Sequence, residues 1–227
     1  MAPIKQLFME NQVFGRLPEK TLDMLIQRAS VHRYQKGEVI VHAGEIWRYL
    51  FLITEGSVQA VKLSNEGRNL VVTTFARGDI FWGIAFFYAD MPMPVSLEAY
   101  ESTLIYLWQD ELLHPIFKRE GEACWELTRL MIQKMTRASE ILEEIAFQPV
   151  AGRLAKLLLE TGQGNPTAPI ARSLTLDEMA ARIGSTREMV CRFLHRFQDE
   201  GLIDITRTDF RITDPLGLQT LTQKAKG

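Results

Sequence analysis

Hydrophobic positions in the first half of the chain recur at helical spacing and then at strand spacing. The segment LPEKTLDMLIQRA predicts a short helix. Four strand-like runs follow, each ending at a turn glycine: EVIVHAG, YLFLITEG, SVQAVKLSNEG and LVVTTFARG. Such runs favour an antiparallel roll or barrel. The segment SLEAYESTLIYLW predicts one further strand and extends the roll to about Trp108.

The pattern changes between Glu122 and Ile145, a stretch without glycine or proline. It predicts a helix of about 24 residues, roughly 36 Å long. Apolar residues three and four positions apart form one stripe on this helix: Cys124, Leu127, Met131, Met135, Ala138, Leu142 and Ile145. We expect Leu127 to Ile145 of this stripe to form a homodimer interface. The alternative is that the stripe docks on the chain's own roll.

The last 79 residues predict a winged helix-turn-helix. Pro149 can occupy the first turn of a helix at VAGRLAKLLLE, and TGQGNPTAP, residues 161–169, is the best candidate for a linker. Two helices then begin with capping-box patterns, Thr175 with Glu178 and Ser185 with Glu188. Gly184 permits a tight turn between them. The segment LIDITRTDFRITD predicts two short strands around a polar tip.

The second of these helices, STREMVCRFLHRF, has an apolar stripe and a cationic surface. The stripe consists of Val190, Phe193, Leu194 and Phe197, and the cations are Arg187, Arg192, His195 and Arg196. Given the flanking elements, we expect this helix to enter the major groove of DNA. A basic surface helix in an unrelated fold is the alternative.

Composition narrows the class of protein. Hydrophobic residues make up 46% of the 227 residues, no apolar run approaches a membrane span of about 20 residues, and no secretory signal pattern opens the chain. Cys124 and Cys191 are too few for a disulfide framework. We therefore expect a cytoplasmic protein without membrane attachment, and both cysteines are expected to be packing residues, with a redox role left open.

Charge is distributed unevenly along the chain. Residues 1–148 carry 15 Lys and Arg against 19 Asp and Glu, a balance of −4, whereas residues 149–227 carry 11 against 9, a balance of +2. This asymmetry is a weak indication that only the second part meets nucleic acid.

About residues 14–213 resemble the Crp/Fnr family of bacterial transcription regulators. The likeness rests on LFLITEGSVQAVKLSNEGRNLVVTTFARGD, ASEILEEIAFQPVAGRLAKLLL, LTLDEMAARIGSTREMVCRFLHRFQDEGLI and the glycine framework. The resemblance implies an α+β protein with a jelly-roll-like antiparallel β-roll that senses an effector (residues 1–121), a long dimerisation helix with a hinge (122–147), and a winged helix-turn-helix DNA-binding domain (148–227). It also implies a homodimeric regulator, expected to be an activator, that binds palindromic double-stranded promoter DNA and contacts RNA polymerase.

The family's base-reading pattern R-E-x-x-x-R falls on Arg187, Glu188 and Arg192. An Arg side chain can donate two hydrogen bonds to guanine, and a Glu carboxylate can accept one from cytosine. The resemblance therefore implies an inverted repeat of TGTGA-like half-sites. Glu188 has an alternative role in the predicted capping box, and Arg187 has an alternative role as a phosphate contact. Candidates for phosphate contacts are Thr175, Ser185, Thr186, Arg196 and Arg207. One departure weakens this set: Leu176 stands where members that bind cyclic AMP have a cationic residue.

The sensor segment departs further from the family. Members that bind cyclic AMP use Glu for the ribose and Arg plus Ser for the cyclic phosphate. When this sequence is aligned with that pattern without gaps, Gly83 takes the place of the Glu, Met93 that of the Arg and Pro94 that of the Ser. A buried cyclic phosphate there would lack its counter-charge, so we expect an effector other than cyclic AMP. An iron–sulfur cluster is not expected either, because no cysteine precedes Cys124.

The remaining hypothesis for the sensor is a pocket that binds an apolar effector. Candidate residues of a pocket for a small apolar effector are Phe81, Trp82, Gly83, Ile84, Met93, Pro94 and Val95. The alternative is that these side chains fill the roll's core. Haem is left open as a cofactor, with His32, His42 and His114 as conceivable axial ligands.

Two other function classes fit the sequence less well. A cupin-like roll enzyme needs a ligand set such as H-x-H, which this sequence lacks, so no metal site is expected. A ligand-binding regulatory module without promoter binding is disfavoured by the complete helix-turn-helix.

Overall fold

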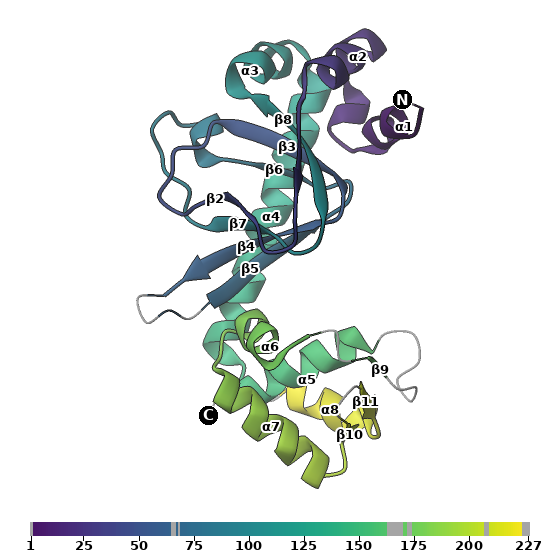
Figure 1. Ribbon diagram of the computed structural model, residues 1–227, viewed down its shortest axis with the longest axis vertical. Coiled ribbons are helices and arrows are strands. Elements are labelled where there is room, and N and C mark those ends of the chain that lie inside the picture. The colour runs from purple at the N-terminus through teal and green to yellow at the C-terminus, as the bar shows by residue number, and fades with distance from the viewer. Residues whose placement is uncertain are drawn as a thin grey trace. The chain divides into compact units, whose positions relative to one another are not determined.

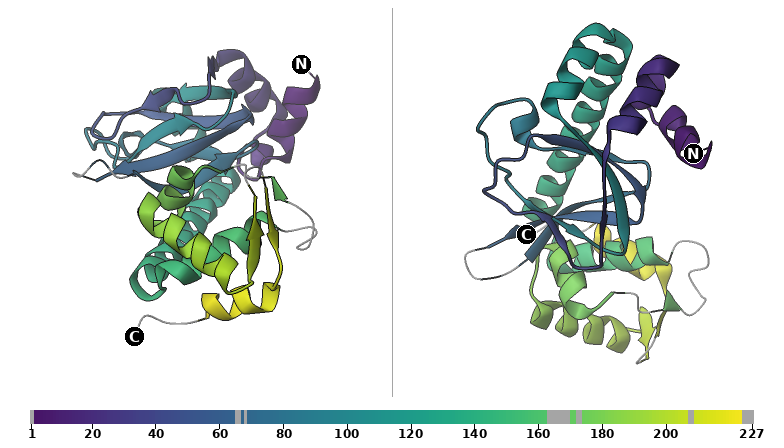
Figure 2. Two further views of the ribbon diagram at one scale, coloured as in Figure 1. Left: turned by 60° about the horizontal axis from the view of Figure 1, so that its bottom comes forward. Right: turned by 45° about the horizontal axis from the view of Figure 1, so that its top comes forward.

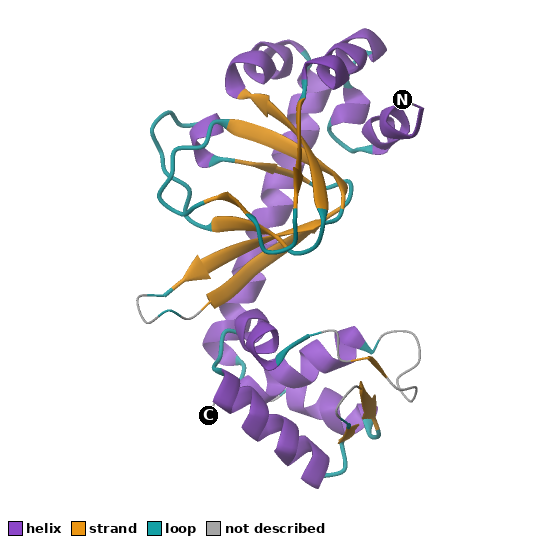
Figure 3. Cartoon of the chain, in the orientation of Figure 1, coloured by secondary structure: helices purple, strands orange, loops and turns teal. Residues whose placement is uncertain are grey.

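The computed structural model describes residues 2–64, 67, 69–162, 170–171, 174–206 and 209–223. The chain divides into two compact units, Met1–Lys62 with Val72–Thr136, and Leu63–Val71 with Arg137–Gly227. Strands dominate the first unit and helices the second (Figure 3). Among the described helices, none is both long and apolar enough to cross a membrane.

The first unit is a roll of two four-stranded sheets preceded by helices (Figure 1). The predicted N-terminal helix is α2, Glu19–Arg28, and it follows α1, Ala2–Glu10, and a 3-10 turn, Phe14–Arg16. One sheet has the order β1-β8-β3-β6 and the other β2-β7-β4-β5. The strands are β1 Ser30–Tyr34, β2 Val39–Val41, β3 Tyr49–Glu55, β4 Ser57–Leu63, β5 Asn69–Ala76, β6 Ile80–Trp82, β7 Ser96–Ala99 and β8 Thr103–Gln109.

The prediction of one strand over SLEAYESTLIYLW is wrong. The segment forms β7 and β8, which belong to different sheets. Hydrogen bonds to a single residue of β4 hold the corner between them: the amide of Tyr100 and the hydroxyl of Thr103 both donate to the Ser57 carbonyl, each over 2.9 Å. The alternating pattern continues through this corner, so periodicity alone does not reveal it.

Strand β3 is buried on both faces, because it lies between two hydrophobic cores. Phe51 and Ile53 pack with residues from both sheets, including Phe75, Leu97 and Ile105. Leu50 and Leu52 pack instead among residues from the helices of this unit. Trp108 belongs to the same second core, where its indole N–H donates to the Leu25 carbonyl over 2.8 Å. Two buried faces explain the unbroken apolar run YLFLIT.

The long helix α4 spans Gly121–Phe147 and follows α3, Asp110–Arg119. It extends beyond the predicted helix at both ends. Its first turns pack on the roll, and Leu127, only 3% exposed, belongs to the roll's own core. The roll itself therefore covers Leu127, which leaves little of this side chain for the predicted dimer interface. Cys124 of the predicted stripe is exposed. Further along, the ammonium of Lys134 lies 4.8 Å from the centre of the Phe75 ring.

Where the structure describes it, the second unit contains four further helices and a small sheet. In chain order these are α5 Val150–Thr161, β9 Ile170–Ala171, α6 Leu176–Ile183, α7 Arg187–Asp199, β10 Ile203–Ile205, β11 Asp209–Ile212 and α8 Pro215–Thr222. Pro149 is the N-cap of α5, one residue before its first turn. Helix α8, which the sequence analysis missed, packs closely on α5: a Cβ on Gly152 would lie 2.7 Å from the Leu221 carbonyl oxygen. Most of the predicted linker, residues 163–169, lies outside the described residues.

Candidate nucleic-acid interface

Helix α6 and the turn after it are built as the sequence predicts. Thr175 is the N-cap: its hydroxyl accepts from the Glu178 amide over 3.2 Å, and its own amide donates to the Glu178 carboxylate over 2.7 Å. Gly184 ends the helix in the left-handed region with φ of 61°, which glycine adopts without strain. The Ser185 amide then donates to the Ala180 carbonyl over 2.9 Å, an arrangement that closes the C-terminus of α6.

The predicted capping box of Ser185 with Glu188 is wrong. Ser185 belongs to the turn, because its amide already caps α6, and α7 begins one residue later than predicted. Its N-cap is Thr186, whose hydroxyl accepts from the Met189 amide over 3.3 Å. The backbone amide of Glu188 and the hydroxyl of Thr186 hold the pKa of the Glu188 carboxyl below its ordinary value. Glu188 is therefore a charged acceptor at the exposed start of α7.

Helix α7 buries one face and presents the other to solvent. Val190, Leu194 and Phe197 are buried and Phe193 is half-buried, which confirms the predicted apolar stripe. The three arginines of the helix and its histidine lie on the exposed side: Arg187, Arg192, His195 and Arg196. The hairpin of β10 and β11 lies beside α7 (Figure 2). A winged helix-turn-helix with an accessible, cationic second helix results.

The three candidate base readers each have a defined neighbour. Arg187 Nη1 lies 3.2 Å from Asp177 Oδ2 of α6. Arg192 donates to the Met189 sulfur over 2.6 Å, and its guanidinium carbon lies 5.6 Å from the centre of the Phe193 ring. Glu188 and Arg192 are four residues apart and so share a face of the helix.

The candidate phosphate contacts cluster around the two helix starts, with two exceptions. Thr175 and Thr186 are N-caps, and Ser185 is half-buried in the turn. Arg196, further along α7, pairs with Glu200 over 2.7 Å. Arg207 lies outside the described residues.

One functional candidate, Arg153 of α5, was missed by sequence reasoning. It is 7% exposed and donates to carbonyls in the helix-turn-helix turn. In VAGRLAKLLLE it stands next to small and apolar residues, a weak signal that also fits an ordinary surface arginine.

The candidate effector residues pack largely within the roll. Met93 is buried in the core between the sheets, where Phe81 and Val95 pack against it, while Trp82 packs on the helix-covered core. Gly83 is buried, and a Cβ there would lie 1.8 Å from the Trp47 carbonyl oxygen. Ile84 is half-buried and Pro94 is exposed. This packing favours the core-filling alternative for Phe81 and Met93.

The three conceivable haem ligands lie apart in the fold. His114 of α3 bonds through Nε2 to the Phe86 carbonyl over 2.5 Å, so this nitrogen is already engaged. His32 is exposed on β1, stacked on Tyr34, and His42 is exposed just after β2. Within the described part of the chain, no group of three His, Cys, Asp or Glu side chains could hold a metal ion.

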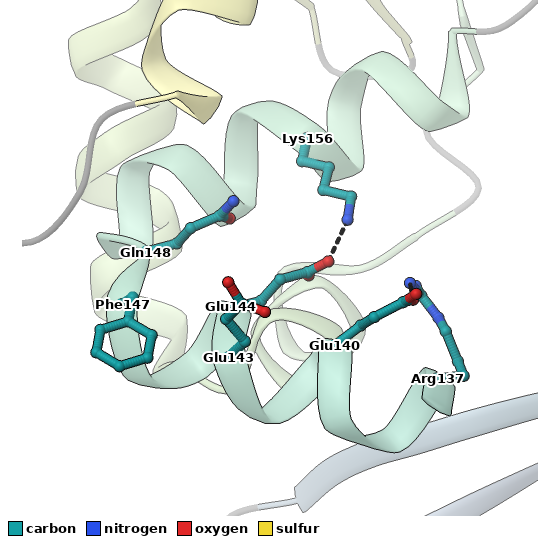
Figure 4. Close-up of a pocket in the computed structure, with 7 residues that line it drawn as sticks. All are labelled: Arg137, Glu140, Glu143, Glu144, Phe147, Gln148 and Lys156. Atoms are coloured by element: carbon teal, nitrogen blue, oxygen red, sulfur yellow. Dashed lines mark hydrogen bonds and ion pairs between the residues drawn. The ribbon is translucent and has the colours of Figure 1, made fainter. Parts of the chain in front are cut away.

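Beyond the roll-covered turns, α4 carries exposed apolar side chains. Met135 and Leu142 are each 68% exposed, Met131 and Ala138 are also exposed, and Ile145 is half-buried. Ile132, absent from the predicted stripe, is exposed as well. Near the C-terminal end of α4 lies a hollow of about 400 Å³, lined by Arg137, Glu140, Glu143, Glu144, Phe147, Gln148 and Lys156 (Figure 4).

Comparison with known proteins covers both units. Residues 31–120 match the cyclic nucleotide-binding domain family and residues 152–221 the Crp-like helix-turn-helix domain family. The cAMP-activated global transcriptional regulator CRP of Pasteurella multocida is 23% identical over 189 residues, 82% of this chain and 90% of that protein. The cAMP-activated global transcriptional regulator Vfr of Pseudomonas aeruginosa is 25% identical over 195 residues, which cover 82% of this chain and 90% of that protein.

Solved structures agree in fold. A structure described as a transcriptional regulator of the Crp/Fnr family from Eubacterium rectale superposes with a TM-score of 0.77 at 24% identity, covering 93% of this chain and 98% of that one. The c-di-GMP responsive regulator CLP of Xanthomonas campestris superposes with a TM-score of 0.76 at 17% identity. The match covers 86% of this chain and 99% of that one. The roll, the winged helix-turn-helix and the two domain matches establish that this chain is a DNA-binding transcription regulator of the Crp/Fnr family.

Proposed function

We propose that this regulator is a homodimer that reads an inverted-repeat promoter site of TGTGA-like half-sites through α7 and responds to an effector other than cyclic AMP. The observation that carries the proposal is the two-sided character of α7. Its apolar stripe is buried while Arg187, Glu188 and Arg192 remain exposed. Side chains so placed are accessible to base edges in the major groove.

The chemistry of these side chains fits G·C pairs. A guanidinium presents a bidentate fork to guanine O6 and N7, and a carboxylate accepts from cytosine N4. Glu188 is ionised at neutral pH and its pKa lies below the ordinary value, which suits an acceptor. Phe193 beneath Arg192 restricts the fork to fewer orientations.

Phosphate contacts would hold the helix in register. Thr175, Ser185 and Thr186 lie at or beside the N-termini of α6 and α7, where the helix dipoles favour an anion. Arg196 and Arg207 are proposed as further phosphate contacts. RNA polymerase is the proposed protein partner, on the strength of the family alone.

The proposed dimer interface is the exposed apolar side of α4 beyond its roll-covered turns. Met135 and Leu142, one heptad apart, are its centre, with Met131, Ala138 and Ile145 beside them. Large apolar side chains this exposed are typical of a surface that another molecule covers. A two-fold dimer places its reading helices about 34 Å apart, one turn of DNA.

The proposed effector differs from cyclic AMP because Gly83, Met93 and Pro94, which stand at the family's nucleotide-binding positions, offer neither space nor a cation for it. Gly83 abuts the Trp47 carbonyl, and Met93 is buried among apolar side chains. A small apolar effector in this region would contact Trp82, Ile84 and Val95, which keep partial exposure.

Selection of binding sites from random duplex DNA tests the proposal. The wild-type protein is expected to enrich a dyad with half-sites about one turn apart. Arg192→Ala should cost about 1–3 kcal/mol per half-site and relax preference at one base pair. Arg196→Ala, the matched control on the same helix, should weaken binding to all sequences alike and reduce the salt dependence. A selected site without a dyad, or uniform loss in Arg192→Ala, contradicts the proposal.

A further inference from the structure

Arg153 is a buried cation whose partners are backbone carbonyls. Its guanidinium donates from Nε to Ile183 O over 2.7 Å, from Nη1 to Gln148 O over 2.6 Å and from Nη2 to Gly184 O over 3.4 Å. Burial lowers the pKa of Arg153, yet an arginine keeps its proton in a protein. The charge is therefore held in the interior by carbonyl dipoles and by the attraction of the Glu144 carboxylate.

These carbonyls belong to the ends of two helices. Ile183 is the last residue of α6 and Gly184 its C-cap, while Gln148 directly follows α4. The C-terminus of a helix carries partial negative charge and unpaired carbonyls. One guanidinium thus satisfies the carbonyls at both ends, which offsets the cost of removing a charge from water.

The position of this contact matters for DNA reading. Gly184 starts the turn that leads to the N-cap Thr186, and Arg187 and Glu188 follow at once. We propose that Arg153 is a positioning residue: by tying the turn to α5 and to Gln148, it fixes the direction in which the first turn of α7 presents its base-reading side chains. The inference rests on the proposed role of α7 as the reader.

Two variants of Arg153 and one matched control test it. Arg153→Met removes all donors, whereas Arg153→Lys keeps the charge but loses the fork. Lys156→Met is the control: Lys156, also on α5, pairs with Glu144 at the rim of the hollow near the end of α4 (Figure 4). The probes are the duplex selected by the wild-type protein and a scrambled duplex of equal length.

The readout is the affinity for the selected duplex divided by the affinity for the scrambled duplex, measured well below the unfolding temperature. A merely structural role of Arg153 would leave this ratio unchanged. Arg153→Met should lower this affinity ratio about tenfold, which is the loss expected for one base contact. Arg153→Lys should lower the ratio less. Lys156→Met should keep it. An unchanged ratio in folded Arg153→Met, or in Arg153→Lys if the former does not fold, overturns the inference.

Hydrogen exchange provides a test without DNA. The Ser185 amide, bonded to Ala180 O, should exchange faster in Arg153→Met and Arg153→Lys than in wild type and Lys156→Met. Equal exchange in all four proteins also overturns the inference. A wild-type protein that selects no site would instead contradict the proposed function, and the exchange result would still decide whether Arg153 holds the turn.

Discussion

Arg187 of α7 and Asp177 of α6 form an ion pair across the helix-turn-helix, with Nη1 3.2 Å from Oδ2. Both side chains are mostly exposed, so the pair adds little stability. The pair has a consequence for binding under the proposed role of Arg187, which would have to exchange this carboxylate for DNA. Asp177 therefore competes with DNA for a proposed reading residue.

Replacing Asp177 by Asn should release Arg187 and remove a negative charge near the DNA. We expect affinity for duplex DNA to rise by about two- to fivefold, more at low salt than at high salt, with an unfolding midpoint within about 2 °C of wild type. Salt-titrated fluorescence anisotropy measures the affinity. Glu200→Gln, which frees the proposed phosphate contact Arg196 in the same way, should raise the affinity for all sequences alike. Weaker binding by Asp177→Asn would contradict the competition.

Thr186 and Glu188 form a second coupled pair at the start of α7. Removing the hydroxyl in Thr186→Val should destabilise the unit by about 1 kcal/mol through loss of the N-cap. It should also raise the pKa of Glu188 toward its ordinary value, measured by NMR titration of the carboxyl carbon. Thr186→Ser retains a hydroxyl and should show neither effect.

The direction of the pH dependence follows from the lowered pKa of folded Glu188. A group with a depressed folded pKa stabilises the fold above its ordinary pKa, and the contribution is lost as pH falls through the folded value. The stability difference between wild type and Thr186→Val should therefore be largest near neutral pH and shrink in acid. A difference that grows on acidification would show that Thr186 does not act on Glu188.

The contrast between Leu127 and Leu142 separates core from surface on α4. Leu127→Asp places a charge in the roll's core and should cost about 3–5 kcal/mol, seen as a lowered unfolding midpoint. Met135→Asp with Leu142→Asp should instead leave the helical circular dichroism unchanged and yield monomers by light scattering. Gln133→Asp, at an exposed polar position, should remain dimeric. Well-folded dimers of the double variant would overturn the proposed interface.

Periodicity predicts which segments are helix or strand far better than it predicts what covers each face. The spacing of apolar residues on α4 is the same in its first and later turns, but the roll covers Leu127 and leaves Leu142 exposed. Likewise the alternation in SLEAYESTLIYLW persists through the corner between β7 and β8. The short strand β1, SVHRY, was missed because its residues are mostly exposed and polar.

The candidate interface was predictable to the extent that local chemistry determines it. Thr175, Glu178 and Gly184 specify a cap and a turn by themselves. The cap of α7 was misassigned by one residue, because the Ser185 amide is used by the preceding helix, a competition that pattern reading does not see. The carbonyl contacts of Arg153 depend on three segments meeting in space, so no local signal could identify them.

The final prediction is that cyclic AMP does not bind. Met93 and Pro94 stand where members that bind cyclic AMP have the Arg and Ser for the phosphate, so these two positions supply no cation, and the Trp47 carbonyl fills the space beside Gly83. Calorimetry should show no saturable heat up to about 1 mM nucleotide, which corresponds to a binding free energy weaker than about −4 kcal/mol. Gly83→Glu should not create a site and should instead lower the unfolding midpoint, because its Cβ meets backbone.

Arg77, whose Nε donates to the Thr54 carbonyl over 3.1 Å, is a cation that could substitute. Micromolar affinity that disappears in Arg77→Ala would therefore contradict the prediction and locate the missing counter-charge.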